Sequence, residues 1–313
     1  MPAFAAGGRR RAVRIYMEKN MSRSIVRAAC LLLMLLPLGA AAQPSRGASR
    51  IVEDTVRSSV LDTVRRFNVL LPASYGHDTA RTYPVLYLLH GMGEDHTCWA
   101  LKGRLKDVYD RLAASGAIDE MIIVTPDAGG ADVKHHWQGY FDVPGWAYET
   151  FFFSEFMPRV EQRYRCGGAK ERRAVAGLSM GGGGSVVYAL HRPEDFCAVY
   201  AMSAMLHHDG VKQPASRLDL ALEGYHRNSA LDYMRQDGED RRAPLRAVAW
   251  FVDCGDDDFL LRDNLAFYGL MRRAAVPCEL RVRDGGHDWE YWHSALFRAL
   301  PFVSRAFWRA QAK

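Results

Sequence analysis

The sequence of 313 residues lacks the features that mark several protein classes. It has no internal repeat, and no low-complexity linker divides the chain after residue 50. Hydrophobic residues make up 49% and charged residues 25%, which are average values for a soluble globular protein and exclude disordered, collagen-like and coiled-coil chains. A chain of this length can bury about three quarters of its unfolded surface. We therefore expect one large domain that needs no disulfide for its stability.

Cysteine is scarce, and its spacing does not suit a metal. Five of the six cysteines follow residue 43, and no pair has the spacing of zinc ligands, so we expect no metal and no other cofactor. Cys254 and Cys278 are expected at opposite ends of neighbouring strands. Cys166 and Cys197 are both expected near strand starts, so this is the pair considered for a disulfide, and the sequence leaves their pairing open.

The excess of positive charge is confined to the N-terminus. The formal net charge is +5, but the first fifty residues contain nine Lys or Arg and a single acidic residue, Glu18. The rest of the chain is slightly acidic. A nucleic-acid partner or an anionic membrane partner is therefore not expected.

The N-terminus has the pattern of a secretory signal peptide. Two arginines precede an apolar run at 28–38, which ends in the small residues 39–42. A membrane-spanning helix takes about 20 apolar residues, so this run is too short. We assign 1–42 to an extended N-terminus and signal peptide, and 43–313 to one folded domain. This assignment predicts export to the periplasm or the medium, without stable membrane insertion after cleavage.

Apolar runs of strand length alternate with helical patterns along this domain. The run at 84–89 is apolar throughout, as expected of a strand buried on both faces. The alternation predicts the α/β class: a mostly parallel central sheet with helices on both faces, led in by two antiparallel strands. The segment 205–245 is polar and irregular and is a candidate cap over a site. Strands are predicted at 51–61, 66–71, 84–89, 121–125, 173–176, 198–201, 247–252 and 279–282, and helices at 101–114, 151–164, 182–190, 261–274 and 291–308.

Residues 177–181, G-L-S-M-G, match the nucleophile elbow G-x-S-x-G. A strand pattern enters this motif and a helical pattern leaves it, as the sharp strand-to-helix turn requires. The glycines allow the strained turn, and the helix N-terminus adds positive potential beside the serine. Ser179 is therefore the candidate nucleophile. The alternative is a glycine-rich turn that only eases packing.

A serine hydroxyl needs a base, and the base needs an orienting acid. His287 follows the last predicted strand, on the sheet edge where Ser179 is expected, and is the candidate base. The acid is expected between the serine and the histidine in chain order. Residues 251–259, F-V-D-C-G-D-D-D-F, offer four carboxylates there, and the pattern alone leaves the choice open among Asp253, Asp256, Asp257 and Asp258.

An oxyanion hole needs two backbone N–H groups. Met180 follows the nucleophile and supplies one, and the glycine-rich turn after strand 84–89, H-G-M-G, offers the N–H of Met92. The same turn could instead hold a phosphate. Neither G-x-G-x-x-G nor G-x-x-x-x-G-K-[ST] is present there, so nucleotide binding ranks low.

Aromatic residues gather at 134–146, K-H-H-W-Q-G-Y-F-D-V-P-G-W. Trp137, Tyr140, Phe141 and Trp146 could stack on a sugar or a phenolic ring of a substrate. Ordinary packing under a long loop explains the cluster equally well.

Taken together, these motifs resemble the esterase D-like family of α/β-hydrolases. The family includes feruloyl and acetyl-xylan esterases, S-formylglutathione hydrolases and mycolyltransferases, and the resemblance covers nearly all of 43–313. It comprises Y-P-V-L-Y-L-L-H-G at 83–91, P-D at 126–127, Y-E-T at 148–150, E-F-M-P at 155–158, G-L-S-M-G-G at 177–182, C-G-D-D-D-F at 254–259 and G-H-D-W-E-Y-W at 286–292.

The resemblance implies an α/β-hydrolase fold and a role for each candidate. Ser179 would be the nucleophile and His287 the base. Asp258 would be the acid, because the family's acid stands three residues after the glycine in G-x-x-D. The N–H groups of Met92 and Met180 would hold the oxyanion, with no metal or organic cofactor.

The exported, carbohydrate-directed branch of the family fits best, since S-formylglutathione hydrolases are cytosolic. The resemblance thus implies a serine carboxylic-ester hydrolase that acts on feruloyl or acetyl esters of carbohydrate, with a small molecule or a polysaccharide as substrate. Acyl transfer of the mycolyltransferase type is an alternative, although that group typically has Asp-Gly where this chain has His90 and Gly91. A non-catalytic carbohydrate-binding relative is an alternative of another class, and a serine peptidase ranks lower.

Overall fold

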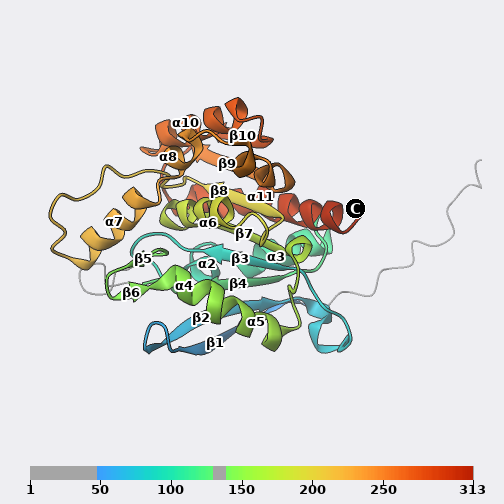
Figure 1. The fold of residues 1–313 in the computed structure, drawn as a ribbon. Helices are drawn as coiled ribbons and strands as arrows, with labels where there is room; N and C mark the ends of the chain where they lie inside the picture. The colour runs from blue at the N-terminus through green and yellow to red at the C-terminus, as the bar shows by residue number, and fades with distance from the viewer. Residues whose placement is uncertain (1–47, 130–138, 313) are drawn as a thin grey trace, which may run out of the picture. The chain divides into compact units, whose positions relative to one another are not determined.

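An eight-stranded sheet organises the structure, a computed structural model that describes residues 48–129 and 139–312 (Figure 1). The first two strands along the sheet pair antiparallel with their neighbours, and the other pairs are parallel. In sheet order the strands are β1 (Arg50–Ser58), β2 (Thr63–Leu71), β4 (Ile122–Pro126), β3 (Val85–Leu89), β7 (Arg173–Leu178), β8 (Ala198–Met202), β9 (Ala249–Gly255) and β10 (Cys278–Arg283).

Helices cover both faces of this sheet, because its central strands are apolar on both sides. In β3, Val85, Tyr87 and Leu89 join one hydrophobic cluster, while Leu86 and Leu88 join the other. The first cluster packs under α4 (Tyr148–Phe151), a π-helical turn (Phe152–Phe156), α5 (Met157–Tyr164), α6 (Ser179–His191) and α10 (Leu261–Arg273). The second packs under α2 (Cys98–Leu101), α3 (Leu105–Ala114) and α11 (Trp289–Gln311).

The predicted strands are all present, and the mostly parallel sheet with helices on both faces is confirmed. The predicted helix at 101–114 is two helices, because Arg104 adopts a left-handed backbone between α2 and α3.

The description of 205–245 as irregular was wrong. This segment contains α7 (Arg217–Arg227), α8 (Ala230–Arg235) and α9 (Glu239–Arg242). Ser216 and Ser229 cap the first two of these helices with their side chains, and Ser216 forms a capping box with Asp219. A serine three residues before an aspartate is the sequence signal that could have found them.

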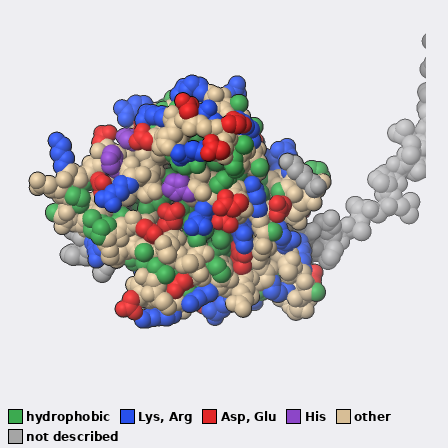
Figure 2. Space-filling model, in the orientation of Figure 1, with side chains coloured by type: hydrophobic (Ala, Val, Ile, Leu, Met, Phe, Trp, Pro, Cys, Tyr) green, Lys and Arg blue, Asp and Glu red, His purple; other side chains and the backbone are tan. Residues whose placement is uncertain are grey.

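The structure bears on the expectations about membrane insertion and about cysteine pairing. Within the described residues, no helix combines the length and the apolar character needed to cross a membrane. The cysteines at 98, 166, 197, 254 and 278 are all free thiols, including the pair Cys166 and Cys197. On the face drawn in Figure 2, acidic and basic side chains are interspersed across most of the surface.

Candidate active site

The candidate residues meet at one edge of the sheet because each follows a parallel strand. Ser179 comes directly after β7 and Ser203 directly after β8. Asp258 lies three residues beyond β9, and His287 four residues beyond β10. The carboxyl ends of parallel strands lie on the same side of a sheet, which is where α/β proteins place their ligands.

The turn that carries Ser179 is tight and strained. Ser179 has a left-handed backbone (φ 52°), which an L-residue adopts at a cost. A Cβ atom at Gly181 would lie 2.5 Å from the carbonyl oxygen of His90, and one at Gly177 would lie 2.5 Å from the backbone of Gly181. Only glycine fits at these two positions, and the resulting close packing holds the serine at the start of α6.

A continuous chain of hydrogen bonds joins Ser179, His287 and Asp258. The Nδ1 atom of His287 lies 2.9 Å from Oδ2 of Asp258, and its Nε2 atom lies 2.9 Å from Oγ of Ser179. Since a carboxylate only accepts, Nδ1 donates to Asp258 and leaves the Nε2 lone pair to accept the serine hydroxyl. The Asp258 side chain is fully buried, whereas that of His287 is 19% exposed.

The surroundings of Asp258 favour its ionised form. Burial alone would raise the pKa of this carboxyl, but hydrogen bonds from His287, the Ser203 hydroxyl and the Leu260 N–H offset burial and lower the pKa below its ordinary value. The Leu260 N–H lies 2.8 Å from Oδ1. Ser203 is itself held by the indole N–H of Trp292, at 3.2 Å. The acid is therefore fixed by a shell of donors.

The other three aspartates of this loop have different partners. Asp253 is fully buried and accepts hydrogen bonds from Tyr200, Tyr291 and Arg281. Asp256 accepts from the N–H of Gly285 at 3.0 Å, and Asp257 is exposed. Of the four carboxylates that the sequence left open, Asp258 is the one that contacts His287.

The loop that follows β3 passes beside the nucleophile. A Cβ atom at Gly91 would lie 2.5 Å from a methyl group of Leu178 and 3.6 Å from Cβ of Ser179. The buried ring of His90 fixes this loop: Nδ1 donates to the carbonyl oxygen of Gly91 at 2.8 Å, and Nε2 accepts the N–H of Ala128 at 2.9 Å. Burial lowers the pKa of His90 despite the nearby Asp127, which keeps the ring neutral. Gly91, which precedes Met92, thus lies beside Ser179 on a backbone segment separate from the one that carries Met180.

Aromatic rings surround His287. The ring of Phe259, which is 75% exposed, lies 4.6 Å from the imidazole, and the ring of Trp292 meets the imidazole edge-on at 4.9 Å. Trp289 packs against Trp99 and Trp292 and donates to Glu94. Sequence reasoning missed Ser203 and Phe259. Ser203 lies two residues beyond the predicted strand 198–201, and Phe259 directly follows Asp258.

The predicted aromatic cluster lies mostly in the core. Tyr140 is fully buried and donates to the carbonyl oxygen of His90, and Trp146 stacks on Tyr148 and donates to the carbonyl oxygen of Gly139. This burial favours the packing alternative for both residues. Trp137 lies outside the described residues. Across 48–129 and 139–312, no group of His, Cys, Asp and Glu side chains could hold a metal ion.

A serine on a strained strand-to-helix turn, next to a His–Asp pair at the carboxyl edge of a parallel sheet, is the arrangement of a serine hydrolase of the α/β-hydrolase class. Residues 58–303 match the family model described as "Putative esterase", and the chain belongs to this family. It is a carboxylic ester hydrolase.

Several relatives are named as ferulic acid, feruloyl or acetyl esterases. A solved structure of a ferulic acid esterase is 54% identical, with a TM-score of 0.81, over 83% of this chain and 99% of that one. An endo-1,4-beta-xylanase/feruloyl esterase of Xylanibacter ruminicola is 36% identical over 132 residues, which are 41% of this chain and 18% of that protein. An acetyl esterase of Caldicellulosiruptor saccharolyticus is 22% identical over 70% of this chain and 83% of its own length.

The curated relatives are often much longer than the part they share with this chain. The match spans 18% of the Xylanibacter protein and 25% of an esterase of Mycobacterium tuberculosis. The sequence resemblance to the esterase D-like family is confirmed, and so is the α/β-hydrolase fold.

Proposed function

We propose that the chain is an exported serine esterase that forms an acyl-enzyme on Ser179 and releases feruloyl or acetyl groups from carbohydrate. The observation that carries the proposal is the hydrogen-bonded chain from Ser179 Oγ through His287 to Asp258, with 2.9 Å at each step. Both contacts are within the range needed for proton transfer in a nucleophile–base–acid arrangement.

In the first step, Ser179 Oγ attacks the ester carbonyl while Nε2 of His287 takes its proton. The carbonyl oxygen becomes an oxyanion, and Asp258 stabilises the imidazolium ion that forms. The bond to the alcohol then breaks, and the alcohol oxygen takes the proton from His287. In the second step, His287 removes a proton from water, the hydroxide attacks the acyl group, and the acid leaves as Ser179 regains its proton.

The N–H groups of Met92 and Met180 are the proposed oxyanion donors. Met180 stands at the start of α6, where backbone N–H groups have no partner within the helix. Met92 stands on the loop that His90 holds beside Ser179. Removing one such donor typically costs about 10² to 10³ in kcat, so this pair would supply a large part of the rate enhancement.

The proposed acyl specificity follows from the relatives and from the rim of the site. The ferulic acid esterase that is 54% identical over most of this chain supports an aromatic acyl group. Phe259 presents an exposed ring beside His287 and could stack on that group. Export rests on the signal-peptide pattern at 1–42.

The test compares the purified full-length chain with Ser179→Ala on p-nitrophenyl acetate and methyl ferulate. Removing a triad nucleophile should lower kcat by roughly 10⁶. The matched control is Ser154→Ala, which removes an exposed serine hydroxyl that takes no part in the hydrogen-bonded chain and should keep the activity. Equal activity in the parent and Ser179→Ala would overturn the mechanism. Adding a sugar acceptor separates hydrolysis, which gives free acid, from acyl transfer, which gives an acylated sugar.

A further inference from the structure

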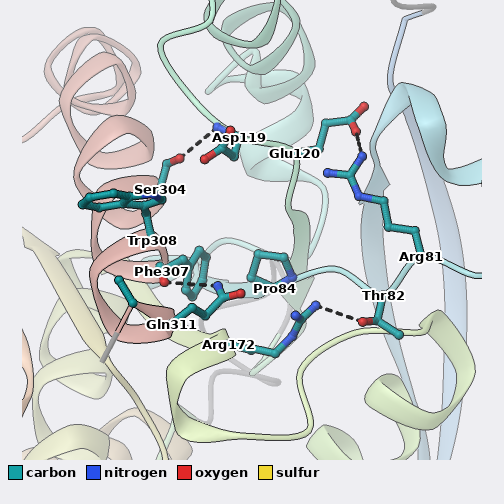
Figure 3. A pocket seen from close by; sticks show the side chains of 11 residues that line it. Arg81, Thr82, Pro84, Asp119, Glu120, Arg172, Ser304, Phe307, Trp308 and Gln311 are labelled. Atoms are coloured by element: carbon teal, nitrogen blue, oxygen red, sulfur yellow. Dashed lines mark hydrogen bonds and ion pairs between the residues drawn. The ribbon is translucent and has the colours of Figure 1, made fainter.

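A cavity lies at the opposite edge of the sheet from Ser179 (Figure 3). It has a volume of about 410 Å³ and opens where β3, β4 and β7 begin. Arg172 directly precedes β7 and lines this cavity, whereas Ser179 directly follows β7. The strand between them has six residues and spans roughly 20 Å, so the cavity is separate from the catalytic site.

One stripe of α11 forms a wall of the cavity. Phe307, Trp308 and Gln311 follow Ser304 by three, four and seven residues and therefore lie on the same side of the helix as Ser304. Phe307 is buried, but Trp308 is 67% exposed, and its indole lies along α11 at the margin of the cavity (Figure 3). Tryptophan is highly buried on average, so an indole exposed beside a cavity is an available apolar platform.

The cavity is lined by equal numbers of positive and negative side chains. Arg81 forms an ion pair with Glu120 at 2.6 Å, and Glu120 also accepts from Ser74, so both groups are engaged. Arg172 and Asp119 remain as one further cation and one further anion. Because the charges of the lining cancel, the cavity favours a neutral ligand over a strong anion.

Donors and acceptors with unused capacity face this space together. Among the described residues, the Asp119 carboxylate has no hydrogen-bond partner, and the Arg172 guanidinium donates once, to Thr82 at 3.1 Å. The amide nitrogen of Gln311 donates to the carbonyl oxygen of Phe307 at 3.1 Å, which leaves the amide oxygen to accept. A hydroxyl group both donates and accepts, so a ligand with several hydroxyls would satisfy this set.

We propose that this cavity binds a sugar residue of the polysaccharide that carries the ester, with one sugar face against Trp308 and its hydroxyls on Asp119, Arg172 and Gln311. A polyhydroxyl ring with an apolar face matches both the indole and the polar groups with unused hydrogen-bonding capacity. The proposal rests on the proposed function for the identity of the polymer. The site holds the enzyme on the polymer and takes no part in the bond-breaking steps.

Binding is tested with Ser179→Ala proteins of full length, so that the polymer is not hydrolysed during the assay. The probes are insoluble wheat arabinoxylan and the soluble neutral oligosaccharide xylohexaose. Trp308→Ala and, separately, Asp119→Ala should weaken binding to arabinoxylan by roughly tenfold, while Trp308→Phe should keep much of it. The control is Phe297→Ala, which removes another partly exposed aromatic ring from α11 outside the cavity.

A parallel assay on methyl ferulate uses the active enzyme with the same cavity substitutions. The kcat/KM value on this small ester should be unchanged, since the cavity is remote from Ser179. The proposal is overturned if Trp308→Ala and Asp119→Ala bind arabinoxylan as tightly as the parent. The acidic polymer polygalacturonate is assayed alongside arabinoxylan and xylohexaose as a charged comparison. The proposal is equally overturned if the parent binds neither arabinoxylan nor xylohexaose, or binds polygalacturonate alone. If methyl ferulate is not hydrolysed while arabinoxylan binding depends on Trp308, the proposed esterase specificity fails and the cavity proposal stands.

Discussion

At the carboxyl edge of the sheet, backbone segments pass so close to one another that Gly177 and Gly181 cannot carry a side chain. At the amino edge, the cavity beside α11 is lined by long side chains, and Trp308 is mostly exposed. The first edge fixes its reacting atoms through short backbone contacts and a buried carboxylate. The second presents a platform and polar groups with spare hydrogen-bonding capacity.

The difference between the two edges matches the different requirements of proton transfer and of polymer binding. Proton transfer needs atoms held within a few tenths of an ångström, because small displacements cost large factors in rate. Holding a polymer tolerates looser geometry, because each contact adds a modest amount of binding energy. Substitutions at the carboxyl edge should therefore act on kcat, and substitutions at the amino edge should act on polymer binding.

After Ser179→Ala, the substitution with the largest expected effect at the carboxyl edge is Asp258→Asn. The amide cannot stabilise the imidazolium ion and favours the wrong tautomer of His287, so kcat should fall by about 10⁴ with little change in KM. The measurement is steady-state kinetics on methyl ferulate. Asp257→Asn is the matched control, since Asp257 is the exposed neighbour in the same loop. Similar losses in both variants would contradict the assignment of the acid.

A second prediction concerns the close contact under the nucleophile. In Gly181→Ala, the new methyl group would lie 2.5 Å from the carbonyl oxygen of His90, so the loop and the serine must move apart. We expect about a 10²-fold loss of kcat/KM, with a loss of stability of about 1–3 kcal/mol. Activity assays and urea unfolding check this. In Gly76→Ala, the added methyl meets nothing within 4 Å, and both quantities should stay near the parent values.

A third prediction tests the exposed ring beside His287. Phe259→Ala removes an aromatic surface from the rim but leaves the hydrogen-bonded chain in place, so kcat/KM on methyl ferulate should fall roughly tenfold. Hydrolysis of p-nitrophenyl acetate, whose acyl group is small, should fall much less. Val64→Ala, an exposed apolar residue on β2, is the control. Equal losses on the two esters would argue against stacking on the acyl group.

The smallest expected effect is a pH dependence from His90. Its pKa is lowered by burial in the folded state, so below about pH 6.5 the unfolded chain binds a proton that the folded chain resists. Stability should therefore decline as the pH falls from 6.5 towards the folded-state pKa. His90→Asn should flatten this decline in urea midpoints measured between pH 7.5 and 5, whereas replacing the exposed His77 by Asn should not. An unchanged slope in His90→Asn would contradict the prediction.

Most of the fold could be read from the sequence because its central strands are continuous apolar runs. The run at 84–89 and the G-L-S-M-G motif fixed where the sheet lies and where it turns into α6. Polar 205–245 was harder, because its helices are short and depend on serine caps and tertiary contacts rather than on a long apolar stripe.

Site residues that are marked by nearby sequence could be predicted, and those that are distinguished only by contacts across the fold could not. Ser179 and His287 follow from position after a strand, whereas Asp258 could not be separated from Asp253 by pattern alone. The two differ in their partners across the sheet: Asp253 meets two tyrosines and an arginine, and only the folded chain brings those groups together. The burial of Tyr140 and Trp146 likewise depends on which elements cover them.

The left-handed backbone of Ser179 lowers the stability of the fold at the residue that catalysis requires. Such a conformation costs an L-residue about 1–2 kcal/mol, and glycine would adopt it without that cost. Ser179→Gly should therefore relieve strain while abolishing the nucleophile. A search for variants of higher thermal stability would tend to replace this serine. Screens of this enzyme should therefore measure esterase activity as well as stability after heating.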